Sequence, residues 1–239
     1  PLDFRSRLYS VPNFLNPQGN DIAKGLLTFA EGKPITTQKA ADWLAVHGAN
    51  CFGEDKCSFA ERVAWVKANE FSIRASAKSP LDHTWWTQAD DPFQFLAFCI
   101  EYSGFLSEGF GYISHLPIAI DGSCNGLQHF SAMLRDEVGG AAVNLVPGDT
   151  PADIYQEVAD SVIKKLQVEV GTKDELLAKQ WLDFGITRKT VKRCVMVVPY
   201  GGSKHSSRKF IEEYIEKRVD EDGAVRPWLK DFDAALYLS

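Results

Sequence analysis

The stretch TRKTVKRCVMVVPYGG, residues 187–202, carries the sharpest structural signal in the chain. Its pattern predicts a helix that Thr187 caps and that Pro199 stops near Val198. Four cations crowd the start of this helix: Arg188, Lys189, Lys192 and Arg193. The helix dipole is positive there, and like charges four residues apart repel each other. Phosphate groups that neutralise the cluster explain this arrangement, and a solvated basic face with acidic partners from elsewhere in the fold is the alternative.

Charge is unevenly distributed over the 239 residues, whose formal net charge is −6. Residues 184–211 hold seven lysines and arginines and no acid, so anion binding should be local. The contents of 45% hydrophobic and 24% charged residues are ordinary for a globular domain. The sequence contains neither a run of about 20 apolar residues nor a signal segment, so it predicts neither a membrane span nor secretion. The five cysteines form no CxxC, which disfavours a zinc site or a disulfide framework and fits reduced thiols.

A second informative segment begins with LPIAID, residues 116–121, which predicts a buried strand. The small-residue turn 121–124 follows, and Asn125 is expected to cap a helix over 126–136 that ends before Gly139 and Gly140. A carboxylate at the end of a strand, Asp121, is a natural Mg²⁺ ligand, and the bare backbone of the next residue, Gly122, admits a metal or a phosphate. An ordinary Asp-Gly turn is the alternative interpretation.

Helical periodicity dominates the remaining sequence. Further helices are expected over 22–30, 37–46, 58–69, 93–106 with Asp91 as cap, 151–166 with Thr150 as cap, 174–184 with a Thr172/Glu175 capping box and Gly185 at its end, and 204–219. The aromatic residues expected in the core are Trp85, Trp86, Phe93, Phe95 and Phe98. With one clear strand among these helices, the fold class is α+β and helix-rich.

Four residues recur along one face of the basic helix: Arg188, Lys192, Met196 and Tyr200. Two cations followed by an aromatic ring could hold a triphosphate and its sugar. A turn aromatic that packs on the core is the alternative interpretation of Tyr200.

The spacing Arg188-x3-Lys192-x7-Tyr200-Gly201 resembles the fingers-helix motif of a polymerase group that includes single-subunit RNA polymerases and related DNA polymerases. DGSCNGLQHFSAMLRDEVGG, from Asp121, is similar to the first catalytic motif of phage-type and mitochondrial-type DNA-directed RNA polymerases. Other segments resemble the same family in its order: DFRSRLYSVPNFLNPQGNDIAKGLL, HGANCFGEDK, AKSPLDHTWW and DPFQFLAFCIEY. The resemblance covers nearly the whole chain.

This resemblance implies template-directed RNA synthesis from DNA, by nucleotidyl transfer with two Mg²⁺ ions that activate the primer 3′-hydroxyl and stabilise the pyrophosphate leaving group. Asp121 would be the first of two metal-binding aspartates, and the carbonyl of Gly122 would help to hold a metal. Lys192 and Arg188 would contact the incoming triphosphate. Tyr200, followed by Gly201 in the same motif, would close the nucleotide pocket and distinguish ribose from deoxyribose.

The expected partners are a DNA template, the RNA transcript and ribonucleoside triphosphates, bound by a monomer that contacts no membrane. By resemblance, Arg7 and Tyr9 would touch the template or hybrid, and Lys24 would do the same. Lys189 and Arg193 are expected to bind nucleic-acid phosphates, which give position rather than sequence readout.

The family's architecture is a cupped right hand. Residues 1–146 would form the first part of the palm, with the N-terminal template-contacting motif, and 147–239 a truncated first part of the fingers. The family's glycine in the N-terminal motif is Ser6 here, which puts a close backbone approach at that position in doubt. The second catalytic aspartate has no counterpart before Ser239. We therefore expect an incomplete piece of a catalytic core, inactive alone.

Two other functions stay open: a related template-directed DNA polymerase, and a non-catalytic nucleic-acid-binding module that keeps the basic helix. Against the DNA polymerase, no glutamate stands in the turn after Asp121, where such enzymes carry a sugar-excluding acid. Members of this family transcribe phage DNA in the bacterial cytoplasm, and others act in organelles. The cytoplasm of a phage-infected bacterium is the favoured location, and an organelle remains open.

Overall fold

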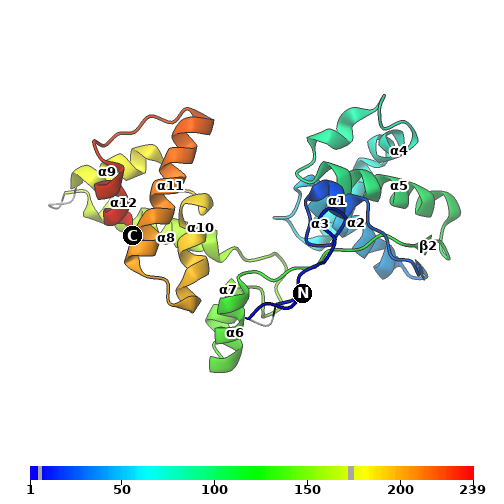
Figure 1. Cartoon of the computed structure of the whole chain (residues 1–239), viewed down its shortest axis with the longest axis horizontal. Coiled ribbons are helices and arrows are strands. Elements are labelled where there is room, and N and C mark those ends of the chain that lie inside the picture. The colour runs from blue at the N-terminus through cyan, green and yellow to red at the C-terminus, as the bar shows by residue number, and fades with distance from the viewer. Residues whose placement is uncertain (5–6, 172–174) are drawn as a thin grey trace. The chain divides into compact units, whose positions relative to one another are not determined.

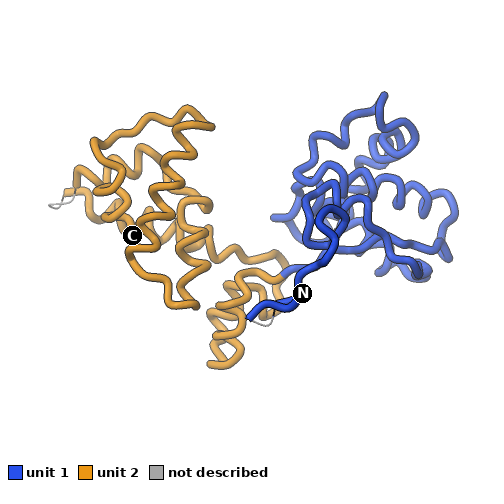
Figure 2. The backbone as a smooth tube through the Cα atoms, in the orientation of Figure 1, with its two compact units in different colours: residues 1–121 blue, residues 122–239 orange. Residues whose placement is uncertain are grey.

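The computed structural model describes residues 1–4, 7–171 and 175–239, so Ser6 and Thr172 lie outside the described residues. The chain forms two compact units, Pro1–Asp121 and Gly122–Ser239 (Figure 2). Helices dominate both units, and the sheet found in the described residues has two short strands. The predicted helix-rich α+β class is confirmed. None of the helices within the described residues has the length and apolar character needed to cross a bilayer.

In unit 1, helix α5 is the element on which three other helices pack: α1, α2 and α4 (Figure 1). The sheet is antiparallel, and Lys33 lies opposite Ser114. The elements of this unit are α1 (Asp21–Gly25), β1 (Lys33–Pro34), α2 (Gln38–Phe52), α3 (Phe59–Ala68), α4 (Glu70–Lys78), the 3₁₀-helix η1 (Thr84–Gln88), α5 (Pro92–Glu108) and β2 (Ile113–Ser114).

Aromatic rings fill the core of unit 1. The Phe52 ring lies 4.8, 4.9 and 5.0 Å, centroid to centroid, from the rings of Trp65, Trp85 and Phe95. Ring pairs at such distances contribute beyond the area that they bury. Three aromatic residues predicted for the core are buried: Trp86, Phe95 and Phe98. Phe93 differs from the prediction, because 40% of it is exposed while its ring edge meets Trp86.

The start of α5 is fixed by a carboxylate from α1. Asp91 occupies the N-cap position, as predicted, but its side chain makes no capping bond. The backbone N–H groups of Phe93 and Gln94 instead donate to Asp21, at 2.8 and 3.0 Å. Helix α1 thus serves α5 as a cap and ends at Gly25, well short of the predicted end.

The segment 116–121 is not a strand, so that prediction is wrong. A strand forms only where a neighbouring backbone pairs with it, and within the described residues no ladder includes this segment. Ile120 is 85% exposed, so its apolar side chain is not buried here. The strand β2 lies just before the segment and pairs with β1.

In unit 2, α8 packs against α9 and α10, and α11 packs against α10 and α12 (Figure 1). Trp181, Ile215 and Ala234 are fully buried in its core, and the Trp181 indole N–H donates to the Ala234 carbonyl at 3.0 Å. The elements are α6 (Asn125–Leu134), α7 (Glu137–Ala142), α8 (Ile154–Glu169), α9 (Glu175–Phe184), α10 (Arg188–Val197), the 3₁₀-helix η2 (Val198–Tyr200), α11 (Lys204–Asp222) and α12 (Asp231–Leu238).

The basic helix begins and ends almost as predicted. Thr187 is its N-cap residue, and its backbone N–H donates to the Thr190 hydroxyl at 3.0 Å. Pro199 falls in η2, where the α-helix gives way to a 3₁₀ turn. Gly185 has a φ of 85° just after α9, which confirms it as the end of that helix.

Several helix starts in unit 2 differ from the prediction. Cys124, with a φ of 58°, and not Asn125, holds the N-cap position of α6. Gly139 and Gly140 lie inside α7, because the Asp136 side chain accepts from the Gly139 N–H and starts a new helix.

Helix α8 starts at Ile154, three residues beyond the predicted first residue. The Asp153 carboxylate caps it and outcompetes the weaker cap at Thr150. Among the described residues, several elements had no counterpart in the predicted set, including β1, α4, η1, β2, α7 and α12.

Candidate functional site

The turn after Asp121 is held by an asparagine side chain from farther along the chain. Asn144 donates through Nδ2 to the Ser123 hydroxyl at 2.9 Å and to the Ala152 carbonyl at 2.8 Å. Its Oδ1 accepts from the Ala152 N–H at 2.7 Å, and its φ is 59°, which asparagine tolerates better than most residues. Asn144 therefore ties the turn to the segment that leads into α8. The sequence analysis missed this residue.

The start of α6 packs closely against η2. A Cβ added to Gly126 would lie 3.0 Å from the Pro199 Cβ and 3.1 Å from the Tyr200 hydroxyl oxygen. The Tyr200 hydroxyl also donates to Asn125 Oδ1 at 3.4 Å. The structure thus brings the motif that follows Asp121 together with Tyr200. Since 68% of Tyr200 is exposed, its ring is not a core aromatic.

Two glycines of the predicted site have different local roles. Gly201 has a φ of 79°, which glycine adopts without penalty, and its N–H donates to the Val198 carbonyl at 3.1 Å. It therefore ends η2. Gly122 is exposed, and a Cβ added there would lie 2.8 Å from Gln128 Oε1, so its missing side chain leaves room for that amide.

The basic cluster divides into paired arginines and lysines without a carboxylate partner. Arg188 Nε lies 2.5 Å from Asp153 Oδ2, and Arg193 pairs with Glu213 of α11. Within the described residues, neither Lys189 nor Lys192 forms an ion pair. Acidic partners from elsewhere in the fold, the alternative considered from sequence, therefore account for the arginines but not for the lysines.

A buried tyrosine ring lies against two of these cations. The Arg188 guanidinium carbon is 5.0 Å from the centroid of the Tyr155 ring, and Lys192 Nζ is 5.8 Å from it. Both distances fall within the range of cation–π attraction. Burial first, and then the neighbouring Cys124, raise the pKa of the Tyr155 hydroxyl. Tyr155 therefore stays neutral and offers the cations a ring face. Sequence analysis did not identify it.

Asp121 is the last residue of unit 1, and one peptide bond joins it to the turn at Gly122. No group of three or more histidine, cysteine or acidic side chains in the described ranges could hold a metal ion. Mg²⁺ usually keeps several waters and takes one or two carboxylates together with substrate phosphates. The exposed Asp121 suits that requirement as one carboxylate ligand.

The three residues predicted to touch the template lie in unit 1. Leu2 and Leu8 form an isolated antiparallel bridge; Arg7 lies between them in the sequence, and Tyr9 directly follows Leu8. The backbone N–H of Arg7 and the hydroxyl of Tyr9 both donate to the Asp3 carboxylate, at 2.9 and 3.2 Å. Lys24 lies on α1. The side chains of Arg7, Tyr9 and Lys24 are exposed, and their contact with nucleic acid stays a prediction.

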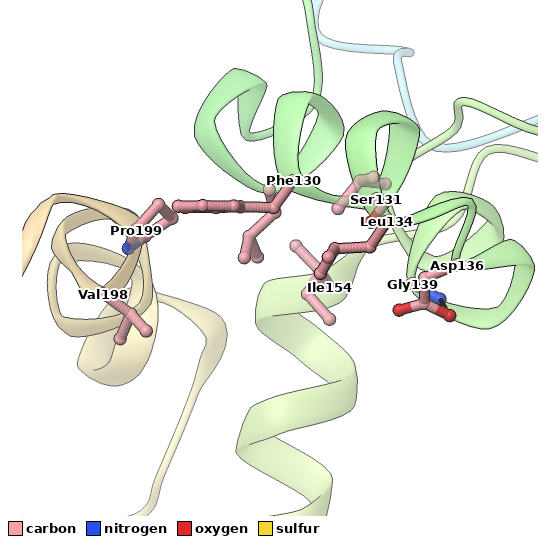
Figure 3. A pocket seen from close by; sticks show the side chains of 10 residues that line it. Phe130, Ser131, Leu134, Asp136, Gly139, Ile154, Val198 and Pro199 are labelled. Carbon is pink, nitrogen blue, oxygen red and sulfur yellow. Dashed lines mark hydrogen bonds between the residues drawn. The ribbon is translucent and has the colours of Figure 1, made fainter.

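A pocket of about 450 Å³ opens in unit 2 between α6, α7, the start of α8 and η2 (Figure 3). Phe130 and Leu134 of α6 line it together with Ile154 and Pro199. Asp136 is the charged residue among its lining side chains, so the pocket is unsuited to phosphate. The side chains predicted to bind anions lie on α10 instead.

Comparisons with known proteins agree with these motifs. The family model of DNA-dependent RNA polymerases matches residues 34–239. The chain is 47% identical over 243 residues to T7 RNA polymerase of Escherichia phage T7, covering 92% of this chain and 27% of that protein. It is 45% identical over 218 residues to the mitochondrial DNA-directed RNA polymerase of Neurospora crassa, and 42% identical over 223 residues to that of Mus musculus. Those two matches cover 90% and 92% of this chain and 15% and 18% of the relatives.

The chain therefore belongs to the DNA-dependent RNA polymerase family. It spans about a quarter of the length of the phage relatives and less of the mitochondrial ones. The predicted family is confirmed.

Proposed function

We propose that the protein containing this chain synthesises RNA on a DNA template by nucleotidyl transfer. The observation that carries this proposal is the packing of the motif after Asp121 on the end of the basic helix, through Gly126 and Tyr200. These two motifs are far apart in the chain, and the contact between Gly126 and Tyr200 supports a site in which the turn after Asp121 and the basic helix act together. Family membership supports the same conclusion.

The basic helix binds the incoming ribonucleoside triphosphate in this proposal. Arg188 and Lys192 offer fixed positive charge where negative charge develops during phosphoryl transfer. Tyr200, with Gly201 ending the turn behind it, closes the pocket over the sugar and helps to select ribose. The exposure of Tyr200 is consistent with a side chain that meets a ligand.

Asp121 and the carbonyl of Gly122 would hold Mg²⁺ in the complete enzyme. When bound there, Mg²⁺ lowers the pKa of the attacking 3′-hydroxyl and neutralises charge on the pyrophosphate leaving group. Asp121 contributes a carboxylate, and the two-metal reaction also needs the family's second aspartate. The 239-residue chain alone should therefore extend no RNA.

The remaining assignments rest on the resemblance to the family. Residues 1–146 form the first part of the palm and 147–239 the first part of the fingers. DNA template and RNA transcript contact five basic or aromatic side chains: Arg7, Tyr9, Lys24, Lys189 and Arg193. The polymerase acts as a monomer in the cytoplasm of a phage-infected bacterium, with an organelle as the second location.

Primer extension by the full-length protein tests this function. The protein is given a DNA template with a short RNA primer, Mg²⁺ and either ribonucleotides or deoxyribonucleotides. Extension with ribonucleotides supports the proposal, and a preference for deoxyribonucleotides would identify a DNA polymerase. Template binding without extension would identify a non-catalytic module. Lys192→Gln tests the triphosphate assignment, because it should weaken triphosphate use while leaving template binding nearly unchanged.

A further inference from the structure

One carboxylate in unit 2 performs two structural tasks at once. Asp153 Oδ1 accepts from the backbone N–H groups of Tyr155 and Gln156, at 3.1 and 3.4 Å, and so caps α8. Its other oxygen, Oδ2, accepts from Arg188 Nε at 2.5 Å. The capping bonds restrict the rotamer of Asp153, so the second oxygen is presented to Arg188 in a fixed direction.

The Arg188 guanidinium is held on one edge and one face. Only Nε bonds to Asp153, and in the described part of the chain the terminal nitrogens Nη1 and Nη2 have no hydrogen-bond partner. The Tyr155 ring lies under the guanidinium and under the ammonium group of Lys192. The planar fork of an arginine matches two phosphate oxygens, and this arrangement leaves that fork available.

We propose that Asp153 and Tyr155 are positioning residues for triphosphate binding, an inference that rests on the proposed function. Asp153 aims the terminal nitrogens of Arg188, and Tyr155 supports Arg188 and Lys192 on one ring face. Holding the two cations in place before the nucleotide arrives removes the cost of ordering two long side chains on binding. Neither positioning residue touches the reacting atoms.

The same helix offers an internal control. Arg193 also pairs with a carboxylate, Glu213, and its guanidinium carbon lies 4.2 Å from the centroid of the Phe210 ring. That pair is more exposed, with side-chain exposures of 53% and 56%, against 32% and 21% for Arg188 and Asp153. Glu213 lies within α11 and caps no helix. Removing its charge changes a similar ion pair without disturbing the proposed triphosphate site.

The test measures KM and kcat for a ribonucleotide in primer extension by the full-length polymerase. Asp153→Asn keeps the cap, since asparagine caps as well as aspartate, but removes the charge facing Arg188. We expect it to raise KM by about tenfold and to change kcat much less, because a misaimed arginine weakens binding before chemistry. Glu213→Gln should leave KM unchanged. Tyr155→Leu should also raise KM, and Tyr155→Phe, which restores a ring face, should recover most of the loss.

Arg188→Gln separates this inference from the proposed function. If Arg188→Gln leaves KM unchanged, the triphosphate assignment itself is wrong. If Arg188→Gln raises KM but Asp153→Asn leaves it unchanged or lowers it, Asp153 does not position Arg188 and the inference is overturned. Combining Asp153→Asn with Arg188→Gln should add nothing beyond Arg188→Gln, because the two residues act through one guanidinium. An additive double variant would assign Asp153 a separate role.

Discussion

The ion pairs within the basic segment 184–211 predict how steeply the affinity for DNA falls with salt concentration. Three of its seven cations have acidic partners within the described residues: Arg188, Arg193 and Arg208. Its other four cations, Lys189, Lys192, Lys204 and Lys209, have no ion-pair partner there. Each phosphate contact contributes about 0.9 to the slope of log K against log salt concentration on duplex DNA. A lysine without a carboxylate partner that meets a phosphate should contribute fully, and an arginine already paired with a carboxylate should contribute less.

Lys189→Gln should therefore flatten the slope by about 0.9, and Arg193→Gln should flatten it by clearly less. Glu213→Gln should steepen the slope, because it leaves the Arg193 charge available to a phosphate. The assay is the affinity of the full-length polymerase for a duplex without a promoter, measured by fluorescence anisotropy between about 50 and 200 mM salt. Equal flattening by the two cation variants would refute the division into paired and available charges. An unchanged slope in Lys189→Gln would remove Lys189 from the DNA-binding surface.

Two further predictions concern sugar choice and stability. Tyr200→Phe in the full-length polymerase should retain extension and relax the preference for ribonucleotides, since it removes only a hydroxyl beside the sugar; an unchanged preference in competition assays would contradict this. Burial lowers the pKa of His47 from 6.5 to about 4 in the folded chain. As the pH falls, His47 is therefore protonated at a higher pH in the unfolded chain than in the folded one. The contribution of His47 to the free energy of unfolding should stay constant above pH 6.5. It should decrease by about 3 kcal/mol as the pH falls to 4. Urea unfolding followed by tryptophan fluorescence measures this, and a His47→Leu chain that keeps the whole drop would exclude His47 as its cause.

Local signals were enough to predict the helices that define the architecture. Thr187 and Pro199 mark the ends of the basic helix because capping and the missing proline N–H act within one turn. Pro92 marks the start of α5 for the same reason. The segment 116–121 shows where such signals fail, because an apolar run does not reveal whether another strand will pair with it. A sheet of two-residue strands has too short a pattern to be predicted.

The cations of the candidate site were visible in sequence, but their partners were not. Asp153 lies 35 positions before Arg188, and Glu213 lies 20 positions after Arg193. Neither spacing corresponds to a helical or strand repeat, so tertiary packing alone determines these pairs. Tyr155 was missed because a tyrosine near the start of an amphipathic helix looks like an ordinary core residue.

In the proposed reaction, Asp121 and the basic helix act on one bound nucleotide, and single-nucleotide incorporation by Asp121→Asn is the sharpest test of that assignment. The full-length variant is mixed with a primed DNA template and one ribonucleotide, and its incorporation rate and DNA affinity are measured on the same scaffold. Metal stabilisation is realised mainly in the transition state, so the rate should fall by orders of magnitude while DNA affinity stays nearly intact. A rate within a few-fold of the parent enzyme, or a loss of rate matched by an equal loss of DNA affinity, would contradict the assignment of Asp121 to catalysis.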